Sequence, residues 1–346
     1  MGTRSWFRLH SFTGVITGLL LFVVCWSGTV AVLAHELDWL ATPQMRVEPA
    51  GEPVGWTAMQ AAAEAAVPGA RATWIEAPRG ARTAALVRLA QPDGGTVLVA
   101  VDPYRGETTA VFKGSFTVQR FFRSFHRNLF LGSFGHYLVT ALGVTLLLSM
   151  VAALFVYKRW WTRFFRFRPG RGRALWSELH KTGGLWSLWF VLIIGLTGVW
   201  YLVEGVRGDL GDGLLNYSGG DPAYSAQVVP PPTSDTGLPR LSLDDQVTRA
   251  EALWPDFSAR TVALDWVGND VVYIDGQTRF PLVRDRASQV NLDPRTGEVL
   301  LSHRAGELPA YWIWTNMADP LHFGDFAGLA SKVIWFVFGL VLCGLI

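Results

Sequence analysis

Four long runs of the sequence contain no Asp, Glu, Lys or Arg. They cover residues 9–34, 128–157, 182–203 and 333–346. A helix needs about 20 predominantly apolar residues to cross a bilayer, so the first three runs predict complete membrane-spanning helices. The fourth run has 14 residues and reaches the last residue of the sequence, and we expect the sequence to stop inside a fourth span.

The runs predict the order of segments along the chain. We place membrane-spanning helices at 9–34, 134–157, 182–205 and 327–346. Between them lie a first external unit with an interfacial segment at 35–127, a basic loop at 158–181 and a second external unit at 206–325. The proline-rich residues 229–234 predict an extended linker at the start of the second unit.

The first run has an alternative interpretation as a cleaved signal peptide. It follows a basic start, and Val32-Leu33-Ala34 fits a cleavage site. The run is longer than a usual signal core, however, and it takes part in an internal repeat. We therefore interpret it as the first span.

Charged residues predict the orientation, because cytoplasmic loops keep an excess of Lys and Arg. The loop at 158–181 holds eight basic residues and one acid. Residues 35–135 hold ten basic and nine acidic residues, and residues 206–325 hold nine basic and seventeen acidic residues. Together with Arg4 and Arg8 before the first span, this pattern predicts a cytoplasmic N-terminus and two external units. The formal net charge of +2 does not indicate nucleic-acid binding.

The first and third spans carry the same motif. Each begins with Leu-His-x-x-x-Gly, and the histidines are His10 and His180. Seventeen residues after each histidine comes a small polar residue followed by Gly, at Ser27 and at Thr197. We therefore interpret these two spans as copies of each other.

The rest of the chain repeats in the same way. His126 and His322 are each followed by Gly after six and after 17 residues. Both external regions contain Asp-Pro-x-x-Gly-Glu, which is typical of a turn between two strands. The sequence therefore predicts an internally duplicated membrane protein, with a four-helix transmembrane bundle and two α+β units. Within those units we expect helices at 56–66 and 242–252, and strands at 84–89, 96–101, 271–274 and 289–292.

Six of the seven histidines lie in or beside the predicted membrane segments. Ionisable residues at such positions need partners, which makes them functional candidates, although an interfacial His can also simply anchor a helix end. The duplication predicts two facing pairs, His10 with His180 and His126 with His322. Two neutral imidazoles that face each other inside a helix bundle are the ligand set of a six-coordinate b-type haem.

Further residues bear on this hypothesis. Gly14 and Gly184 lie one helical turn beyond their histidines and would let a flat macrocycle approach the backbone. Zinc is the alternative metal, but neither pair has the Cys or carboxylates that would complete four ligands. His136 and His35 also lie near the external interface, and either could replace a partner in the second pair. His303 is expected at the surface of the second unit.

Motifs of other chemistries are missing from the sequence. There is no CxxCH, so any haem would be held noncovalently, and Cys25 and Cys343 form neither a disulfide framework nor a CxxC pair. There is also no GxSxG, Walker or HExxH motif, and no GxGxxG after a strand. The sequence therefore does not support a hydrolase, a nucleotide-driven pump or a built-in nicotinamide or flavin domain.

Taken together, these motifs resemble the PepSY-associated transmembrane proteins of the bacterial inner membrane, also called iron-regulated membrane proteins. The resemblance rests on the two Leu-His-x-x-x-Gly starts, on Phe125-His126-Arg127, on Pro320-Leu321-His322-Phe323-Gly324 and on the Asp-Pro-x-x-Gly-Glu segments. It covers nearly the whole chain. It implies a four-helix domain in the inner (cytoplasmic) membrane with two periplasmic PepSY-like units.

The resemblance also implies a function. Family members that act as siderophore reductases carry electrons across the inner membrane through two b haems. By motif, His10 and His180 would ligate the haem on the cytoplasmic side, and His126 and His322 the haem on the periplasmic side. The expected activity is an oxidoreductase that reduces ferric iron in a siderophore or another ferric chelate. Some relatives append a cytoplasmic flavodoxin-reductase-like module that this sequence lacks, so we expect a separate cytoplasmic electron donor.

Two alternatives stay open at this point. The first is a haem-free sensor or interaction protein whose PepSY-like units bind a periplasmic peptide or protein, and it predicts a colourless preparation. The second is a haem protein that passes electrons to a protein acceptor. Visible spectra would exclude the first alternative, and the kinetics of chelate reduction would decide the second.

Overall fold

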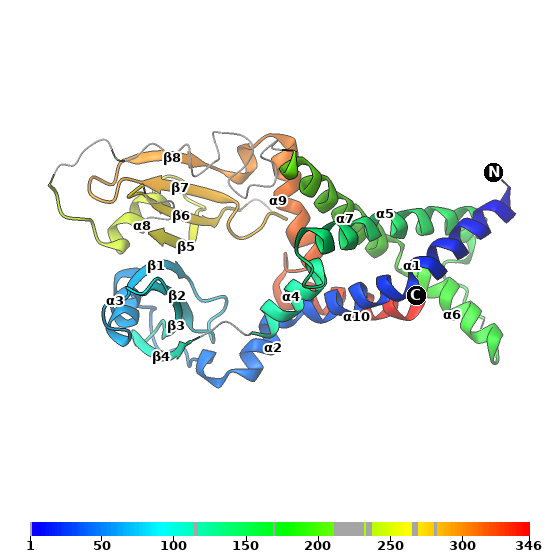
Figure 1. Cartoon of the computed structure of the whole chain (residues 1–346), viewed down its shortest axis with the longest axis horizontal. Helices are drawn as coiled ribbons and strands as arrows, with labels where there is room; N and C mark the ends of the chain where they lie inside the picture. The colour runs from blue at the N-terminus through cyan, green and yellow to red at the C-terminus, as the bar shows by residue number, and fades with distance from the viewer. Residues whose placement is uncertain are drawn as a thin grey trace. The chain divides into compact units, whose positions relative to one another are not determined.

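Figure 1 shows the computed structural model of the chain, which describes residues 2–113, 117–168, 170–210, 232, 237–264, 269–279 and 282–346. The chain forms two compact units. The helical unit comprises Met1–Leu37, Thr117–Asp212 and Ala318–Ile346, and the sheet unit comprises Asp38–Phe116 and Gly213–Met317. The linker expected at 229–234 lies outside the described residues except for Pro232.

Four helices of the helical unit are long and apolar enough to cross a membrane. They are α1 (Thr3–Val32), α5 (Gly132–Val156), α7 (Leu188–Asp209) and α10 (Gly328–Leu345). The prediction of a membrane protein with four transmembrane helices is therefore confirmed. Shorter helices precede or connect them, namely α2 (Ala34–Ala41), α4 (Val118–Asn128), α6 (Arg173–Trp186) and α9 (Ala310–Phe323).

The third span is divided, which differs from the continuous helix expected at 182–205. Helices α6 and α7 meet at Ser187, and α6 already begins inside the loop expected at 158–181. The repeat-matched residue of the first span is Thr17, where α1 continues without interruption. The Thr17 hydroxyl donates to the Thr13 carbonyl at 2.7 Å, whereas the fully buried Ser187 hydroxyl has no partner among the described residues.

Glycines at matched positions let the spans cross closely. A Cβ on Gly339 of α10 would lie 2.4 Å from the hydroxyl oxygen of Thr29 in α1. A Cβ on Gly143 of α5 would lie 3.0 Å from the backbone nitrogen of Val199 in α7. Small residues at helix crossings are typical of membrane proteins, and the two copies use the same arrangement for α1 with α10 and for α5 with α7.

The sheet unit contains one eight-stranded antiparallel sheet with the order β4-β3-β2-β1-β5-β6-β7-β8. Its strands are β1 (Arg71–Glu76), β2 (Ala85–Ala90), β3 (Thr96–Asp102), β4 (Glu107–Phe112), β5 (Ser258–Leu264), β6 (Val272–Gln277), β7 (Ser288–Leu292) and β8 (Val299–His303). The two expected α+β units therefore share a single sheet. They join where β1 pairs with β5, with Ile75 opposite Val262 and Glu76 opposite Thr261.

Helices cover one face of this sheet. Helix α3 (Trp56–Ala66) packs on β1 to β4, and α8 (Leu243–Glu251) packs on β5 and β7. Apolar side chains of both helices meet alternate strand residues in one buried core, which includes Met59, Ile75, Val247 and Ile274. Burying a side chain of this size contributes about 1.5–3 kcal/mol, so this shared core holds both halves of the sheet together.

The two helices also cap each other. Helix α3 begins after Gly55, which has no side chain to accept a hydrogen bond, and the Asp244 carboxylate of α8 accepts from the Trp56 nitrogen at 2.6 Å instead. In return, the Asp244 nitrogen donates to the Thr57 hydroxyl at 3.3 Å. A Cβ on Gly55 would lie 2.4 Å from the Asp244 carboxylate, so a side chain at this position would displace the cap.

The Asp-Pro-x-x-Gly segments form the predicted turns in both halves. The side chains of Asp102 and Asp293 each accept from the backbone nitrogen two residues further on, at 2.8 Å and at 2.7 Å. The glycines of the motif have positive φ, +67° at Gly106 and +71° at Gly297. This conformation is accessible to glycine at little cost, so the prediction of a duplicated turn is confirmed.

Candidate functional site

The four candidate histidines lie on four different helices of the helical unit. His10 is on α1 and His180 on α6, whereas His126 is on α4 and His322 on α9. The ring centres of His10 and His180 are 6.0 Å apart, and those of His126 and His322 are also 6.0 Å apart. The structure therefore brings together the same two pairs that the sequence repeat indicates.

The two pairs lie at different levels of the bundle. Nδ1 of His126 is 2.9 Å from the carbonyl oxygen of Val24, which is 14 residues beyond His10 on α1. At 1.5 Å per residue, this places the pairs roughly 20 Å apart along the helix. The hydrocarbon core of a bilayer is about 30 Å thick, so the separation corresponds to about two thirds of it.

Hydroxyl groups at matched positions contact the second pair. Thr197 Oγ1 of α7 lies 2.8 Å from Nδ1 of His322, and its own hydrogen is directed to the Ile193 carbonyl at 2.7 Å. The threonine oxygen therefore accepts from Nδ1, which leaves Nε2 of His322 to face the other ring. Ser27, the repeat equivalent of Thr197, lies 3.5 Å from Nδ1 of His126.

Backbone groups at matched positions contact the first pair. Nδ1 of His10 lies 3.0 Å from the carbonyl oxygen of Ser149 and 2.9 Å from its hydroxyl oxygen. His180 forms a hydrogen bond with the backbone of Leu345. Ser149 and Leu345 are both 23 residues beyond the histidines of the second pair, so the copies bond at equivalent positions. A metal-ligating histidine commonly donates its other ring N–H in this way, which fixes the orientation of the ring.

Glycines adjoin both pairs. A Cβ on Gly28 of α1 would lie 2.6 Å from Cε1 of His126, so the missing side chain makes room for the ring. At Gly14 and Gly184, a Cβ would meet no described atom within 4 Å. The helices are thus open beside the first pair, where a macrocycle would need to approach the backbone.

Both pairs have the spacing of a metal held between two imidazoles. Two metal–nitrogen bonds of about 2 Å, together with the distance from each nitrogen to its ring centre, separate the ring centres by about 6 Å. Within the part of the chain that the structure describes, no group of three or more His, Cys, Asp or Glu side chains is placed to hold a metal ion. A tetrahedral zinc site would therefore lack its remaining ligands. Haem supplies four nitrogens of its own and needs two from the protein, so the residues present fit haem.

The alternative histidines have other surroundings. His136 lies against α7, with Nε2 3.2 Å from the place that a Cβ on Gly205 would occupy. His35 is partly buried on α2. The ring contact between His126 and His322 favours their pairing, and the assignment of these residues as ligands remains a prediction.

A row of polar residues crosses the face of the sheet opposite α8. Thr261, Asp275, Gln289 and His303 are cross-strand neighbours on β5 to β8. Burial raises the pKa of Asp275 to about 6. Burial also lowers the pKa of His303 to about 4. The expectation that His303 lies at the surface is therefore wrong, because its strand places it among partly buried residues.

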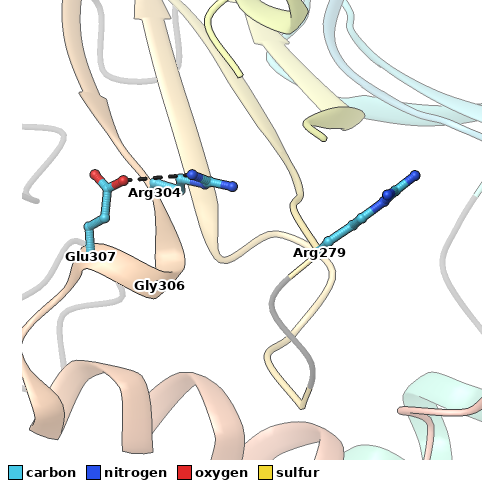
Figure 2. Close-up of a pocket in the computed structure, with 4 residues that line it drawn as sticks. All are labelled: Arg279, Arg304, Gly306 and Glu307. Atoms are coloured by element: carbon cyan, nitrogen blue, oxygen red, sulfur yellow. Dashed lines mark ion pairs between the residues drawn. The ribbon is translucent and has the colours of Figure 1, made fainter. Parts of the chain in front are cut away.

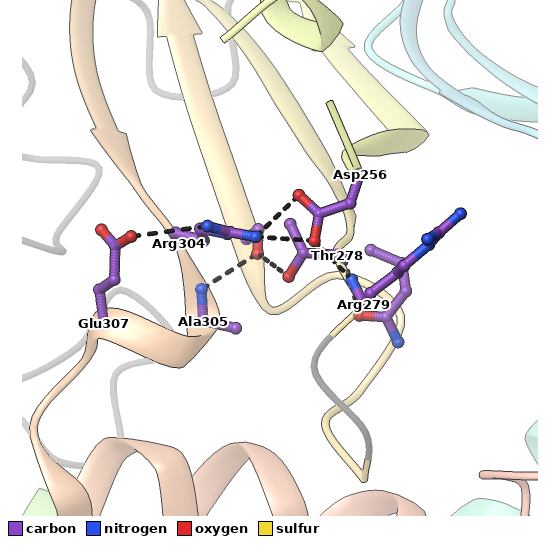
Figure 3. Close-up of polar contacts among 8 residues, drawn as sticks. Asp256, Thr278, Arg279, Arg304, Ala305 and Glu307 are labelled. Atoms are coloured by element: carbon purple, nitrogen blue, oxygen red, sulfur yellow. Dashed lines mark hydrogen bonds and ion pairs between the residues drawn. The ribbon is translucent and has the colours of Figure 1, made fainter. Parts of the chain in front are cut away.

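The sheet unit has a pocket of about 230 Å³ lined by Arg279, Arg304, Gly306 and Glu307 (Figure 2). Figure 3 shows that the guanidinium of Arg304 donates to both carboxylate oxygens of Asp256, at 2.8 Å and 2.7 Å. The backbone nitrogen of Arg279 donates to the same carboxylate at 3.0 Å. Hydrogen bonds from Arg304 and Arg279 hold the pKa of Asp256 below its usual range. We interpret this group as a structural junction that ties the ends of β6 and β8 to the segment before β5.

Comparison with known proteins assigns the chain to a family. A family model described as the PepSY-associated TM region matches residues 7–346, which include both histidine pairs and all the strands of the sheet. The chain belongs to this family. The resemblance inferred from the repeated motifs is thus confirmed for the family, and with it the combination of membrane helices and α+β units.

This PepSY-associated protein is also similar to the uncharacterized protein PA4219 of Pseudomonas aeruginosa. The two are 29% identical over 222 residues, which make up 59% of this chain and 53% of that protein. The match thus spans about half the length of the relative. Its name states no activity, so the function is argued from the residues of the two histidine pairs.

Proposed function

We propose that this PepSY-associated membrane protein holds two b-type haems and transfers electrons across the membrane to a ferric chelate, such as a ferric siderophore, in the periplasm. The observation that carries the proposal is the presence of two equivalent histidine pairs, each with 6.0 Å between ring centres. His10 and His180 would hold one haem, and His126 and His322 the other. When bound, the haems supply the one-electron redox chemistry.

The protein's own residues would orient these ligands and set their basicity. Thr197 and Ser149 engage Nδ1 of one histidine in each pair, so Nε2 remains directed to the facing ring. Hydrogen bonds of this kind raise the basicity of the ligating nitrogen, and burial in the bundle adjusts the reduction potential further. No acid–base residue is required. Reduction favours release of the iron, because Fe(II) is a poorer fit than Fe(III) to hard oxygen chelators.

The charge pattern supports an orientation for this transfer. His180 follows the basic loop at 158–181, and His10 follows Arg4 and Arg8. Under the positive-inside rule these segments are cytoplasmic, so the electron donor would approach the first pair. The sheet unit would then lie in the periplasm, on the side of the second pair, where the ferric chelate would be reduced.

The proposal is tested by the reduced-minus-oxidised visible spectrum of the detergent-purified protein, with haem counted per polypeptide. We expect two low-spin haems, with one lost in His10→Ala and the other lost in His322→Ala. His303→Ala, in the sheet unit, is the control and should keep both. A colourless protein from haem-replete cells would contradict the proposal and favour a haem-free periplasmic binding protein.

A second measurement addresses the electron acceptor. Protein reduced with dithionite and then mixed with a ferric siderophore should be reoxidised rapidly, and variants that lack the second haem should lose this rapid phase. A protein that holds both haems but is not reoxidised by ferric chelates would point to a protein acceptor instead.

A further inference from the structure

Helix α4 has three chemically different faces. Successive residues of a helix are separated by about 100° around its axis. His126 lies on the side that meets α1, where its ring contacts the Val24 carbonyl. Phe121 and Phe125 lie together on a second side. The third side carries Arg120, Arg123 and Arg127.

The phenylalanine face continues onto the start of a membrane span. The ring of Phe121 is 6.2 Å from that of Phe125 and 5.3 Å from that of Phe130, which lies in the turn between α4 and α5. Phe121, Phe130 and Phe134 are 40%, 55% and 70% exposed. Because α5 is one of the four spanning helices, this exposed aromatic surface adjoins the hydrocarbon region of the bilayer.

The arginine face has no counter-charge within the described parts of the protein. Arg120, Arg123 and Arg127 are all exposed, and none of them forms an ion pair with a described carboxylate. A helix with aromatic residues on one side and arginines on the other is typical of segments that lie in the membrane interface. Three guanidinium groups on one side of such a helix would lie at the depth of the lipid phosphates.

The duplication shows that the fold does not require these arginines. Helix α9 presents His322 as α4 presents His126, and the two histidines are 196 residues apart. The positions of α9 that match the three arginines are Asn316, Asp319 and Phe323. Since α9 positions its histidine without a basic face, the basic face of α4 serves another purpose.

We propose that the arginine face of α4 binds the phosphate groups of anionic phospholipids, with the phenylalanine face inserted beside their acyl chains. The planar guanidinium donates two parallel hydrogen bonds to phosphate oxygens, which suits Arg to this contact. Each basic residue near an anionic membrane surface strengthens binding roughly fivefold. This inference does not depend on haem binding.

The test uses the full-length protein reconstituted in phosphatidylcholine bilayers that contain spin-labelled phosphatidylglycerol or spin-labelled phosphatidylcholine. Electron paramagnetic resonance gives the relative association constant of the two lipids with the protein. We expect a preference for phosphatidylglycerol that decreases in high salt. It should fall roughly tenfold or more in the triple variant Arg120→Gln, Arg123→Gln, Arg127→Gln.

Two control variants make the outcome specific. The triple Arg→Lys variant at the same positions keeps the charge and should retain most of the preference. A triple Arg→Gln variant in the sheet unit, at Arg71, Arg79 and Arg82, removes the same net charge and should leave the preference unchanged. An unaltered preference in the α4 glutamine variant, or an equal loss in the sheet-unit variant, would overturn the proposal. Haem counts and helix content report separately whether α4 still holds His126 in place.

Discussion

Thr197 and His322 are joined by a hydrogen bond of 2.8 Å between Oγ1 and Nδ1. Thr197→Val keeps the shape of the side chain and removes the acceptor. We expect the His322 ring to lose its fixed orientation, and the affinity of the second pair for haem to fall about 10–100-fold, as is usual when the hydrogen-bond partner of a metal-ligating histidine is removed. Haem titration of the purified apoprotein, followed at the Soret band, measures this change.

Thr17→Val is the matched control for this substitution. Thr17 also lies in an apolar span, but its hydroxyl donates to the Thr13 carbonyl of its own helix. Both haem sites should remain intact in this variant. An equal loss of affinity in the two variants would show that Thr197 acts through general helix packing instead of through the His322 ring.

The two repeat-matched glycines Gly28 and Gly198 should respond differently to substitution. A Cβ on Gly28 would lie 2.6 Å from the His126 ring, whereas a Cβ on Gly198 would have Gly143 Cα, at 3.5 Å, as its nearest neighbour. We therefore expect Gly28→Ala to displace His126 and to remove the haem of the second pair. Gly198→Ala should keep both haems. The haem-to-protein ratio measures both outcomes, and loss of haem from Gly198→Ala alone would contradict the geometry.

Some of these relationships could be predicted from the sequence and others could not. The histidine pairs were predictable because each histidine recurs at a fixed distance from a span, and a duplicated unit brings equivalent positions face to face. The contact of Thr197 with His322 depends on how α7 and α9 are rotated, which local sequence does not determine. Its only sequence signal is that Thr197 and Ser27 occupy the same repeat position.

The Asp244 carboxylate, which caps α3 from another helix, should contribute measurably to stability. Asp244→Ala leaves the first backbone N–H groups of α3 without an acceptor, and we expect a loss of about 1 kcal/mol in the free energy of unfolding of the sheet unit. Asp244→Asn keeps an acceptor and should lose much less. Thermal unfolding of the full-length protein, followed by its strand signal in circular dichroism, compares the two variants. Equal destabilisation would mean that the negative charge, and not the hydrogen bond, stabilises the helix.

Asp275 and His303 should give opposing pH dependences. The pKa of Asp275 is raised to about 6, from about 4 in an unfolded chain, so its contribution to stability is present at low pH and is lost as the pH rises through 6. The pKa of His303 is lowered to about 4, from about 6.5, so its contribution is present above pH 6.5 and is lost as the pH falls towards 4. The two effects largely cancel between pH 4 and pH 6.

Substitution of either residue should reveal the pH dependence of the other. In Asp275→Asn, the stability of the sheet unit should rise with pH from 4 to 6.5, by at most about 1.4 kcal/mol per pH unit. In His303→Gln, it should fall from pH 4 to pH 6. Thermal unfolding across this pH range is the measurement. Identical pH profiles in the wild type and both variants would show that neither group is perturbed by burial.

The fold was predictable to different depths in the two units. The four spans follow from uninterrupted apolar runs, and helices α3 and α8 follow from their local patterns. The break at Ser187 could not be predicted, because the sequence on both sides is uniformly apolar and the matched residue Thr17 continues its helix. The pairing of β1 with β5 joins residues nearly 190 positions apart, as Ile75 and Val262 show, and no local pattern specifies such a contact.

This pairing has a consequence for the duplicated chain. Strand β1 lies inside the sheet only because β5 lies beside it, so a chain with the first half alone would expose the backbone groups of Trp74 to Glu76 at an edge. Two equivalent strands that pair antiparallel are related by a two-fold axis, which is also the symmetry of most protein dimers. The sheet unit is therefore organised like a homodimer whose two subunits have been joined into one polypeptide. Each half completes the hydrogen bonding of the other, so neither half is free to change its seam residues independently.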